Sequence, residues 1–198
     1  VIVWLRNPGL EPRHWKQIGD VLECKFGDKG PKNLGEVLAN EELLEERKMD
    51  LEEVCGSADK EYELKRQLKE MEDEWEPIAM NIEDYGTTGT FIFKGADDIL
   101  TLLDDQTLKI QAMRGSPYIK PFEKQCRSWE KRIKSISKCV LEWLKMQGTW
   151  LYLQPIFSSP DIQQQMKKES RMFQKVDIFW RKTMANAKSE PRVAEFFE

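Results

Sequence analysis

The fold is decided by residues 121–153, PFEKQCRSWEKRIKSISKCVLEWLKMQGTWLYL. Apolar residues return through this stretch at alternating intervals of three and four, the spacing of a helix face packed lengthwise against other helices. That face comprises Phe122, Cys126, Trp129, Ile133, Ile136, Val140, Trp143, Gln147 and Trp150. Pro121 suits a first helical turn and Pro155 limits the other end. At ~1.5 Å per residue, the predicted helix is about 50 Å long, which indicates a rod.

Basic residues occupy the remaining circumference of this predicted helix. They are Lys124, Arg127, Lys131, Lys134, Lys138 and Lys145. The charges behind the net value of −4 are unevenly distributed along the chain. Residues 41–105 carry about 21 acids against 7 bases, and residues 106–192 carry about 18 bases against 7 acids. This division favours attraction between parts of one chain, and leaves open a basic face for nucleic acid or another acidic partner. Nucleic acid is the weaker alternative, because the aromatic residues follow the core spacing and would not be exposed for stacking.

Composition is that of a globular protein long enough to bury a core, with 33% charged and 40% hydrophobic residues among 198. No apolar run approaches the length of a membrane span, and residues 1–5 are too short for the apolar part of a signal peptide. The chain begins without methionine, in what reads as an element already under way. We therefore expect it to be an excerpt from a longer polypeptide.

Ahead of the long helix, the pattern predicts helices separated by one hairpin. Helical spacing runs from about residue 11 to 24, from 33 to 38, and through the acidic tract 41–76 until Pro77. Within that tract, Cys55-Gly56-Ser57 indicates either two helices in line or a kink, because glycine weakens a helix interior. Alternation at residues 78–83 and 90–94, around a loop with Gly86 and Gly89, predicts a β-hairpin.

Helical spacing resumes from Asp97 to Met113 and, beyond the connection at residues 155–160, in a short helix at 161–166 and a last long one. That last helix carries Met172, Phe173, Val176, Phe179, Trp180 and Met184. The predicted fold is mainly α: an elongated helical bundle with one small inserted β-hairpin. Its parts are N-terminal helices at residues 1–76, the hairpin at 77–95 and a long-helix bundle at 96–198.

The sequence carries no motif for chemistry. It has no phosphate-binding glycine loop, no H-E-x-x-H and no G-x-S-x-G. His14 is the single histidine, and without a catalytic partner in the sequence it reads as structural or surface. The four cysteines form no metal-binding pair, and Cys126 and Cys139 read as reduced thiols in or beside the core. We predict no catalytic, cofactor-binding or metal-binding residue.

Several blocks in order along the chain resemble the linker region of dynein heavy chains. The longest is 150-WLYLQPIFSS-159, with 113-MRGSPY-118 next. The others are Asn7-Pro8-Gly9-Leu10, Arg13-His14-Trp15, Tyr85, Lys94-Gly95 and Trp129-Glu130. The run Leu103-Asp104-Asp105, together with 113-MRGSP-117, looks more like an axonemal than a cytoplasmic heavy chain, of the inner-arm type. Where some members carry a charged residue near the end of the long helix, this chain has Gly148, which bears on local stiffness.

The resemblance implies the N-terminal part of one linker domain, a curved helical rod that arches over a ring of AAA+ modules and swings with nucleotide state. The segment would be a mechanical lever without chemistry of its own. ATP and Mg²⁺ would be bound elsewhere in the parent motor. The implied partners are the AAA+ ring and tail of the same heavy chain, with dynein intermediate or light chains and microtubules reached through the parent. The implied location is the cytoplasm, the cytoskeleton and the ciliary axoneme.

Two other readings remain open from the residues. One is a helical scaffold or adaptor that docks other proteins through its acidic and basic faces, and the second is an enzyme. We expect neither nucleic acid nor a membrane as partner.

Overall fold

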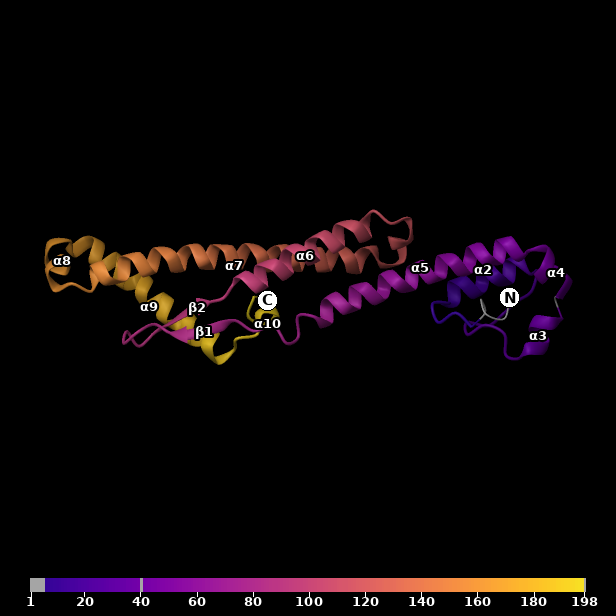
Figure 1. The fold of residues 1–198 in the computed structure, drawn as a ribbon, viewed down its shortest axis with the longest axis horizontal. Coiled ribbons are helices and arrows are strands. Elements are labelled where there is room, and N and C mark those ends of the chain that lie inside the picture. Colours follow the sequence, from indigo (N-terminus) through magenta and orange to yellow (C-terminus); the bar gives the residue numbers. More distant parts are fainter. Residues whose placement is uncertain (1–5, 40, 198) are drawn as a thin grey trace. The chain divides into compact units, whose positions relative to one another are not determined.

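The computed structural model describes residues 6–39 and 41–197, and these are mainly helical with one two-stranded antiparallel sheet (Figure 1). The predicted class, mainly α with an inserted hairpin, is confirmed. The chain forms two compact units, Val1–Glu70 with Met113–Lys124 and Met71–Ala112 with Gln125–Glu198. Across the described ranges, no helix is both long enough and apolar enough to cross a membrane.

The first unit contains the short N-terminal helices and most of the acidic helix. Its elements are α2 (Pro12–Val21), α3 (Leu34–Leu38), α4 (Glu41–Glu46), most of α5 (Lys48–Asp73) and the 3-10 helix η1 (Pro117–Phe122). Its core comprises Trp15, Ile18, Leu22, Val37, Leu44, Leu51 and Cys55. The core thus joins the apolar faces of α2 and α5, as expected where amphipathic helices bury their stripes against each other.

The acidic helix does not break where the sequence pattern indicated. α5 continues through Gly56, and the interruption lies earlier, at Arg47 between α4 and α5. Glycine in a helix interior costs only ~1 kcal/mol relative to alanine. Burial of Leu51, Cys55 and Ala58 on both sides of Gly56 offsets that cost.

His14, on α2, faces α5. Its side chain is buried, and its Nδ1 accepts a hydrogen bond from the Glu11 N–H at 3.1 Å, which closes a capping box at the start of α2. Its Nε2 lies 3.1 Å from Glu61 Oε2 on α5. Nδ1 therefore caps the start of α2, and Nε2 joins α2 to α5.

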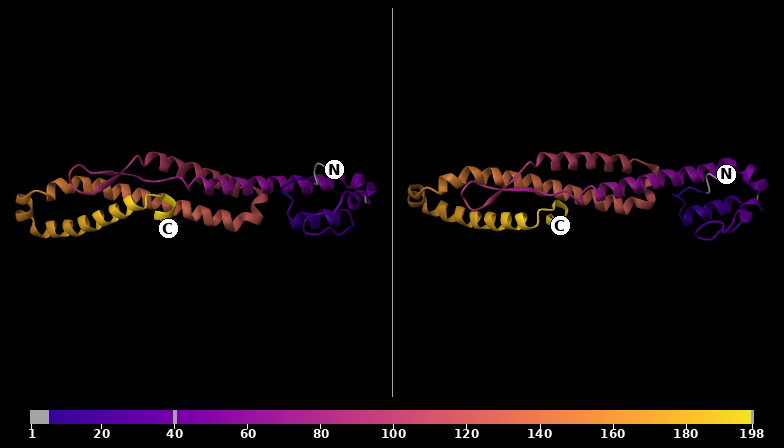
Figure 2. Two further views of the ribbon diagram at one scale, coloured as in Figure 1. Left: turned by 90° about the horizontal axis from the view of Figure 1, so that it is seen from below. Right: turned by 60° about the horizontal axis from the view of Figure 1, so that its bottom comes forward.

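The second unit contains the hairpin and the long helices. Its elements are β1 (Asn81–Asp84), β2 (Phe91–Lys94), most of α6 (Asp97–Arg114), most of α7 (Glu123–Phe157), α8 (Pro160–Gln165), α9 (Lys167–Ser189) and α10 (Val193–Phe196). Figures 1 and 2 show α9 running back along α7, and the ring centroids of Trp143 and Trp180 lie 6.1 Å apart, those of Phe157 and Phe173 5.1 Å. The two helices are therefore antiparallel neighbours.

The predicted apolar face of α7 is confirmed. Its buried members are Cys126, Trp129, Ile133, Ile136, Val140, Gln147 and Trp150. Trp143 is half-buried, Phe122 belongs to η1, and the six predicted basic residues are exposed. Pro155 does not end α7, which continues to Phe157. Phe157 stacks on Phe173 of α9, and this packing offsets the ~3 kcal/mol that a proline costs inside a helix.

The hairpin lies where the pattern predicted, with Ile82 opposite Phe93 and Glu83 opposite Ile92. Its first strand is shorter than expected, because residues 78–80 pair instead with the C-terminal segment. The N–H of Met80 donates to Pro191 O at 2.7 Å, and the N–H of Val193 donates to Ile78 O at 3.0 Å. A segment about 110 residues away in sequence thus covers backbone that would otherwise form an open edge.

Gly148→Ala should stabilise the protein by roughly 0.5–1 kcal/mol, because alanine is the better helix former. A Cβ at Gly148, within α7, would meet no atom within 4 Å. Gly86→Ala is the matched control: space around it is equally open, but its φ of +53° strains any L side chain. Chemical denaturation of both variants checks this. Equal effects of the two substitutions would show that helix propensity at Gly148 does not limit stability.

Candidate functional site

The block 150-WLYLQPIFSS-159 begins in a tightly packed aromatic cluster. Trp150 is 1% exposed, and its ring stacks on Trp180 of α9 at a centroid distance of 5.4 Å and meets Tyr85 of the hairpin loop edge-on at 5.6 Å. Its indole N–H donates to Asp177 Oδ1 at 3.1 Å. One side chain therefore contacts α9 and the hairpin at once.

Gln147, one turn before Trp150, joins α7 to the outer edge of β2. Its Oε1 accepts from the Phe93 N–H at 2.7 Å, and its Nε2 donates to the Phe93 carbonyl at 2.8 Å. The Tyr85 N–H donates to the Thr90 carbonyl across the hairpin, and residue pairs along an antiparallel ladder alternate between hydrogen-bonded and non-hydrogen-bonded. Ile82 and Phe93 therefore form a non-hydrogen-bonded pair, so the N–H and the C=O of Phe93 both point away from β1. The side-chain amide of Gln147 thus makes the two hydrogen bonds to Phe93 that a third strand would make. This is why a polar residue stands in the otherwise apolar face of α7.

Cations of α9 hold the hairpin from its other side. Lys188 Nζ donates to the Ile82 carbonyl at 2.8 Å, and Arg181 Nη1 donates to the Thr88 carbonyl at 2.7 Å. Arg181 is itself oriented by Asp177, whose Oδ2 accepts from Arg181 Nε at 2.7 Å. Asp177 therefore couples the tryptophan cluster to the hairpin loop. We call the set Phe93, Gln147, Trp150, Asp177 and Arg181 the α7–hairpin junction.

A second buried glutamine, Gln106, bonds to two indoles that line an open cleft of the same unit. Gln106 is fully buried; its Oε1 accepts from Trp75 Nε1 at 2.8 Å and Trp129 Nε1 at 3.3 Å. Its Nε2 donates to the Met71 carbonyl at 3.0 Å and to Glu74 at 2.9 Å. α5, α6 and α7 are thereby tied together at one amide, with all its donors and acceptors used.

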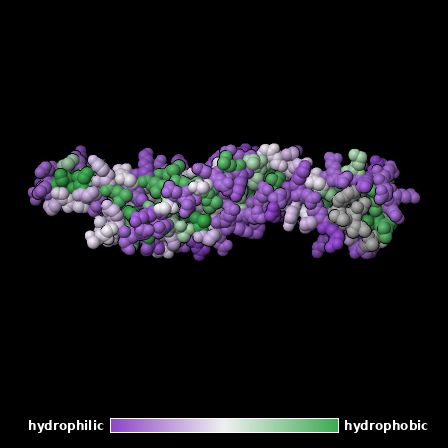
Figure 3. Space-filling model, viewed as in Figure 1, coloured by the Kyte–Doolittle hydropathy of each residue, from purple (hydrophilic) through white to green (hydrophobic). Residues whose placement is uncertain are grey.

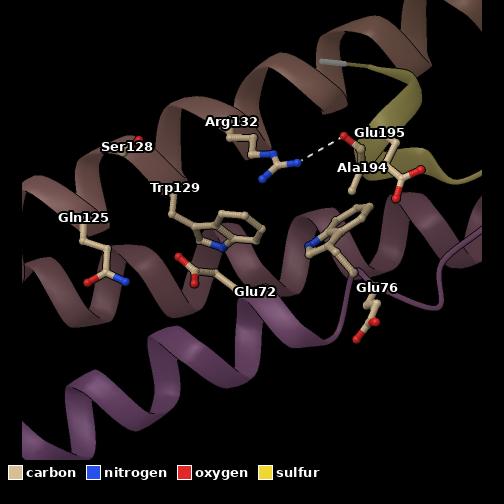
Figure 4. Close-up of a pocket in the computed structure, with 9 residues that line it drawn as sticks. Glu72, Glu76, Gln125, Ser128, Trp129, Arg132, Ala194 and Glu195 are labelled. Atoms are coloured by element: carbon tan, nitrogen blue, oxygen red, sulfur yellow. Dashed lines mark hydrogen bonds between the residues drawn. The ribbon is translucent and has the colours of Figure 1, made fainter.

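The cleft itself, about 430 Å³, is lined by charged side chains above the two indoles. Arg132 lies over the Trp129 ring and donates to the Ala194 carbonyl at 3.1 Å, while Glu72, Glu76 and Glu195 surround the opening (Figure 4). The lining includes neither cysteine nor histidine, so it offers no strong nucleophile. Its contacts are those of packing between α5, α7 and the C-terminal segment.

The cysteines are free thiols in dissimilar settings. Cys55 and Cys126 are buried, Cys24 is half-buried and Cys139 is exposed, so the expected near-core position of Cys139 is wrong. Burial raises the pKa of Cys55, with Asp59 adding to the effect, and burial also raises the pKa of Cys24 beside Glu36. These two thiols stay protonated near neutral pH and are poor nucleophiles. Within the described ranges, no group of three or more His, Cys, Asp or Glu residues has the arrangement of a metal site.

Gln147→Leu should lower the free energy of unfolding by about 1–3 kcal/mol, because the buried N–H and C=O of Phe93 lose their partners. The amide proton of Phe93 should then exchange faster with solvent. Gln125→Leu, an exposed glutamine on the same helix, is the control and should change stability little. Denaturation and amide hydrogen exchange provide the two measurements. Unchanged exchange at Phe93 in Gln147→Leu would refute the role of this amide.

Comparison with known proteins identifies the family. The family model for dynein heavy chain, N-terminal region 2, matches residues 1–198. Human dynein axonemal heavy chain 12 is 41% identical over 184 residues, human dynein axonemal heavy chain 1 is 40% identical over 187, and mouse dynein axonemal heavy chain 3 is 39% identical over 188.

These matches cover 93–94% of this chain and 4–6% of each relative. The chain therefore corresponds to a small part of proteins many times its length. The predicted resemblance to axonemal heavy chains is confirmed. The chain belongs to the dynein heavy chain family, of which it represents N-terminal region 2.

Proposed function

We propose that this segment is a force-transmitting part of the linker of an axonemal dynein heavy chain, which acts as a mechanical lever and carries out no chemistry itself. The observation that supports this most strongly is α7, a helix of 35 residues whose apolar face is buried along its length. A helix held by side-chain packing resists bending without any ligand. Its similarity to the named axonemal chains makes the ciliary axoneme the proposed location.

The contacts around α7 fit a stiff element. Gln106 ties its first part to α5 and α6 near Trp129, and the junction ties its second part to the hairpin and α9 at Gln147 and Trp150. Each tie uses buried hydrogen bonds, which have defined directions and so fix the helix rotation as well as its position. The load applied at one end of α7 is then shared by its neighbours in the second unit.

The remaining partners follow from the proposed role in the longer protein. The AAA+ ring and the tail of the same heavy chain are the proposed neighbours in the motor. Intermediate or light chains and microtubules are reached through the parent, and ATP and Mg²⁺ are bound by its ring. The scaffold or adaptor function is the alternative, favoured by the six exposed bases of α7 that face away from its buried side.

If α7 is a lever, softening it should uncouple motion from ATP turnover. Lys131, Lys138 and Leu141 are exposed on α7, so Lys131→Gly, Lys138→Gly and Leu141→Gly together remove no buried contact. Each glycine costs ~1 kcal/mol of helix stability relative to alanine. In the full-length motor, the triple glycine variant should move microtubules more slowly than the triple alanine variant at the same positions, with similar ATPase rates.

The triple alanine variant controls for the loss of the three side chains. Gliding speed and ATPase activity are measured in the same preparations. Equal gliding by the glycine and alanine variants would show that α7 does not carry the force, and the scaffold function would then be the better explanation.

We further expect this 198-residue segment to bind no ATP, because its sequence contains no phosphate-binding glycine loop. Titration calorimetry with Mg-ATP should give only heats of dilution. Saturable binding at micromolar affinity would contradict the assignment of nucleotide chemistry to other parts of the parent.

A further inference from the structure

A shallow apolar groove runs between α7 and α9, beyond the junction. Met146, Thr149 and Leu153 line it from α7, Phe173 and Val176 line it from α9, and the Trp150 ring contributes to its wall. Its volume is about 280 Å³. This is below the ~300–1,000 Å³ of typical small-molecule pockets, but it suits a few side chains inserted from a partner.

The groove continues into an exposed apolar stripe on α9. Met172, Val176 and Phe179 are spaced by four and three residues, so they share one helix face. They are 62%, 44% and 60% exposed. Of the six apolar residues that the sequence pattern assigns to the last helix, the structure buries Trp180 and Met184, leaves Phe173 half-buried against Phe157 of α7, and exposes these three. Figure 3 likewise shows apolar surface near the α8 end of this unit.

The stripe and groove have basic borders. Lys145 lies on the α7 side, and Lys168, Arg171 and Lys175 are exposed on α9. Within the described chain, no carboxylate lies within ion-pair distance of Lys168, Arg171 or Lys175, and Glu142, 3.9 Å from Lys145, is the acidic residue in the groove lining. Apolar surface bordered mainly by cations, three of which have no carboxylate partner among the described residues, is complementary to a helix that carries apolar residues on one face and acids beside them.

We propose that the α7–α9 groove is a docking site for an amphipathic α-helix with acidic flanks, supplied by a partner protein. The apolar face of that helix inserts between Leu153 and Val176, and its acids meet Lys145 and Lys175. The furrow between two helices receives one helix better than a flat membrane surface, because an inserted side chain reaches its floor. None of Lys131, Lys138 and Leu141, the positions that test the lever function, lines this groove.

The test uses a fluorescent synthetic helix about 20 residues long, with leucines at helical spacing and glutamates beside them. Fluorescence anisotropy should show saturable binding to the chain. Val176→Asp, at an exposed position, should weaken it by about tenfold or more, because a charge replaces an apolar contact at the groove. Lys145→Glu with Lys175→Glu should weaken it comparably. Thermal melting checks that each variant remains folded.

Two control variants and a control peptide distinguish binding at this groove from non-specific binding. Leu108→Asp alters an apolar residue of α6 that is 65% exposed, and Lys131→Glu alters an exposed base of α7 outside the groove; both should leave binding unchanged. A peptide with lysines in place of the glutamates should bind at least about tenfold more weakly. Lack of saturable binding, equal binding of the two peptides, or equal effects of test and control variants would each overturn the proposal.

Two further measurements address other occupants. Sedimentation of the chain alone detects self-association, and flotation with phosphatidylserine vesicles detects membrane binding. Self-association that Val176→Asp abolishes would assign the groove to a second copy, and vesicle binding that Val176→Asp abolishes would assign it to a lipid surface. Either result would overturn the helix proposal. Neither outcome bears on the lever function, which depends on the stiffness of α7.

Discussion

A two-stranded hairpin is marginal in water, and the second unit depends on how the backbone groups at its open edges are satisfied. Phe93 bonds to the amide of Gln147, Ile82 to Lys188, and residues 78–80 to the C-terminal segment. Every one of these contacts brings a different helix or segment to the hairpin. The small sheet therefore works as a template that sets the rotation of α7 and the path of α9, although it contributes few residues.

Contacts between aromatic rings also hold α7 against the segments that pack on it. Trp150 stacks on Trp180, and Trp143 contacts Trp180, Phe196 and Phe197 edge-on. Large rings bury much apolar area and prefer specific relative orientations, so they resist sliding between helices. Hydrogen bonds at Gln147 and ring contacts at Trp150 act on adjacent turns of α7. The helix is held both against rotation and against translation there.

The two charged faces of the chain have separate uses. Several acids of α5 pair within their own unit, as in Glu61 with Arg13 and Glu63 with Arg66. The bases of α7 and α9 remain largely in solvent, apart from those that cap the hairpin. The ion pair between Glu74 and Lys109, whose charged atoms lie 3.7 Å apart, is an example of the predicted attraction between the acidic and basic parts of the chain. Both side chains are well exposed, so this contact is weak.

The spacing of apolar and polar residues was enough to predict the helices, the hairpin, the buried face of α7 and the basic residues on its opposite side. Each of these features depends on the spacing of residues within one segment. It was also enough for the family resemblance, carried by blocks such as 150-WLYLQPIFSS-159. It failed at Gly56 and Pro155, where packing by distant residues offsets a local helix penalty.

Tertiary structure alone decided the roles of the buried glutamines and of the last helix. Gln147 interrupts an apolar series in sequence, and its partner Phe93 lies 54 residues away. Gln106 joins helices that no spacing rule connects. Periodicity placed Phe179 and Trp180 together, whereas the packed helix buries one and exposes the other. The physical reason is common to all three: a side chain's environment is set by the elements brought against it, and a single segment does not contain that information.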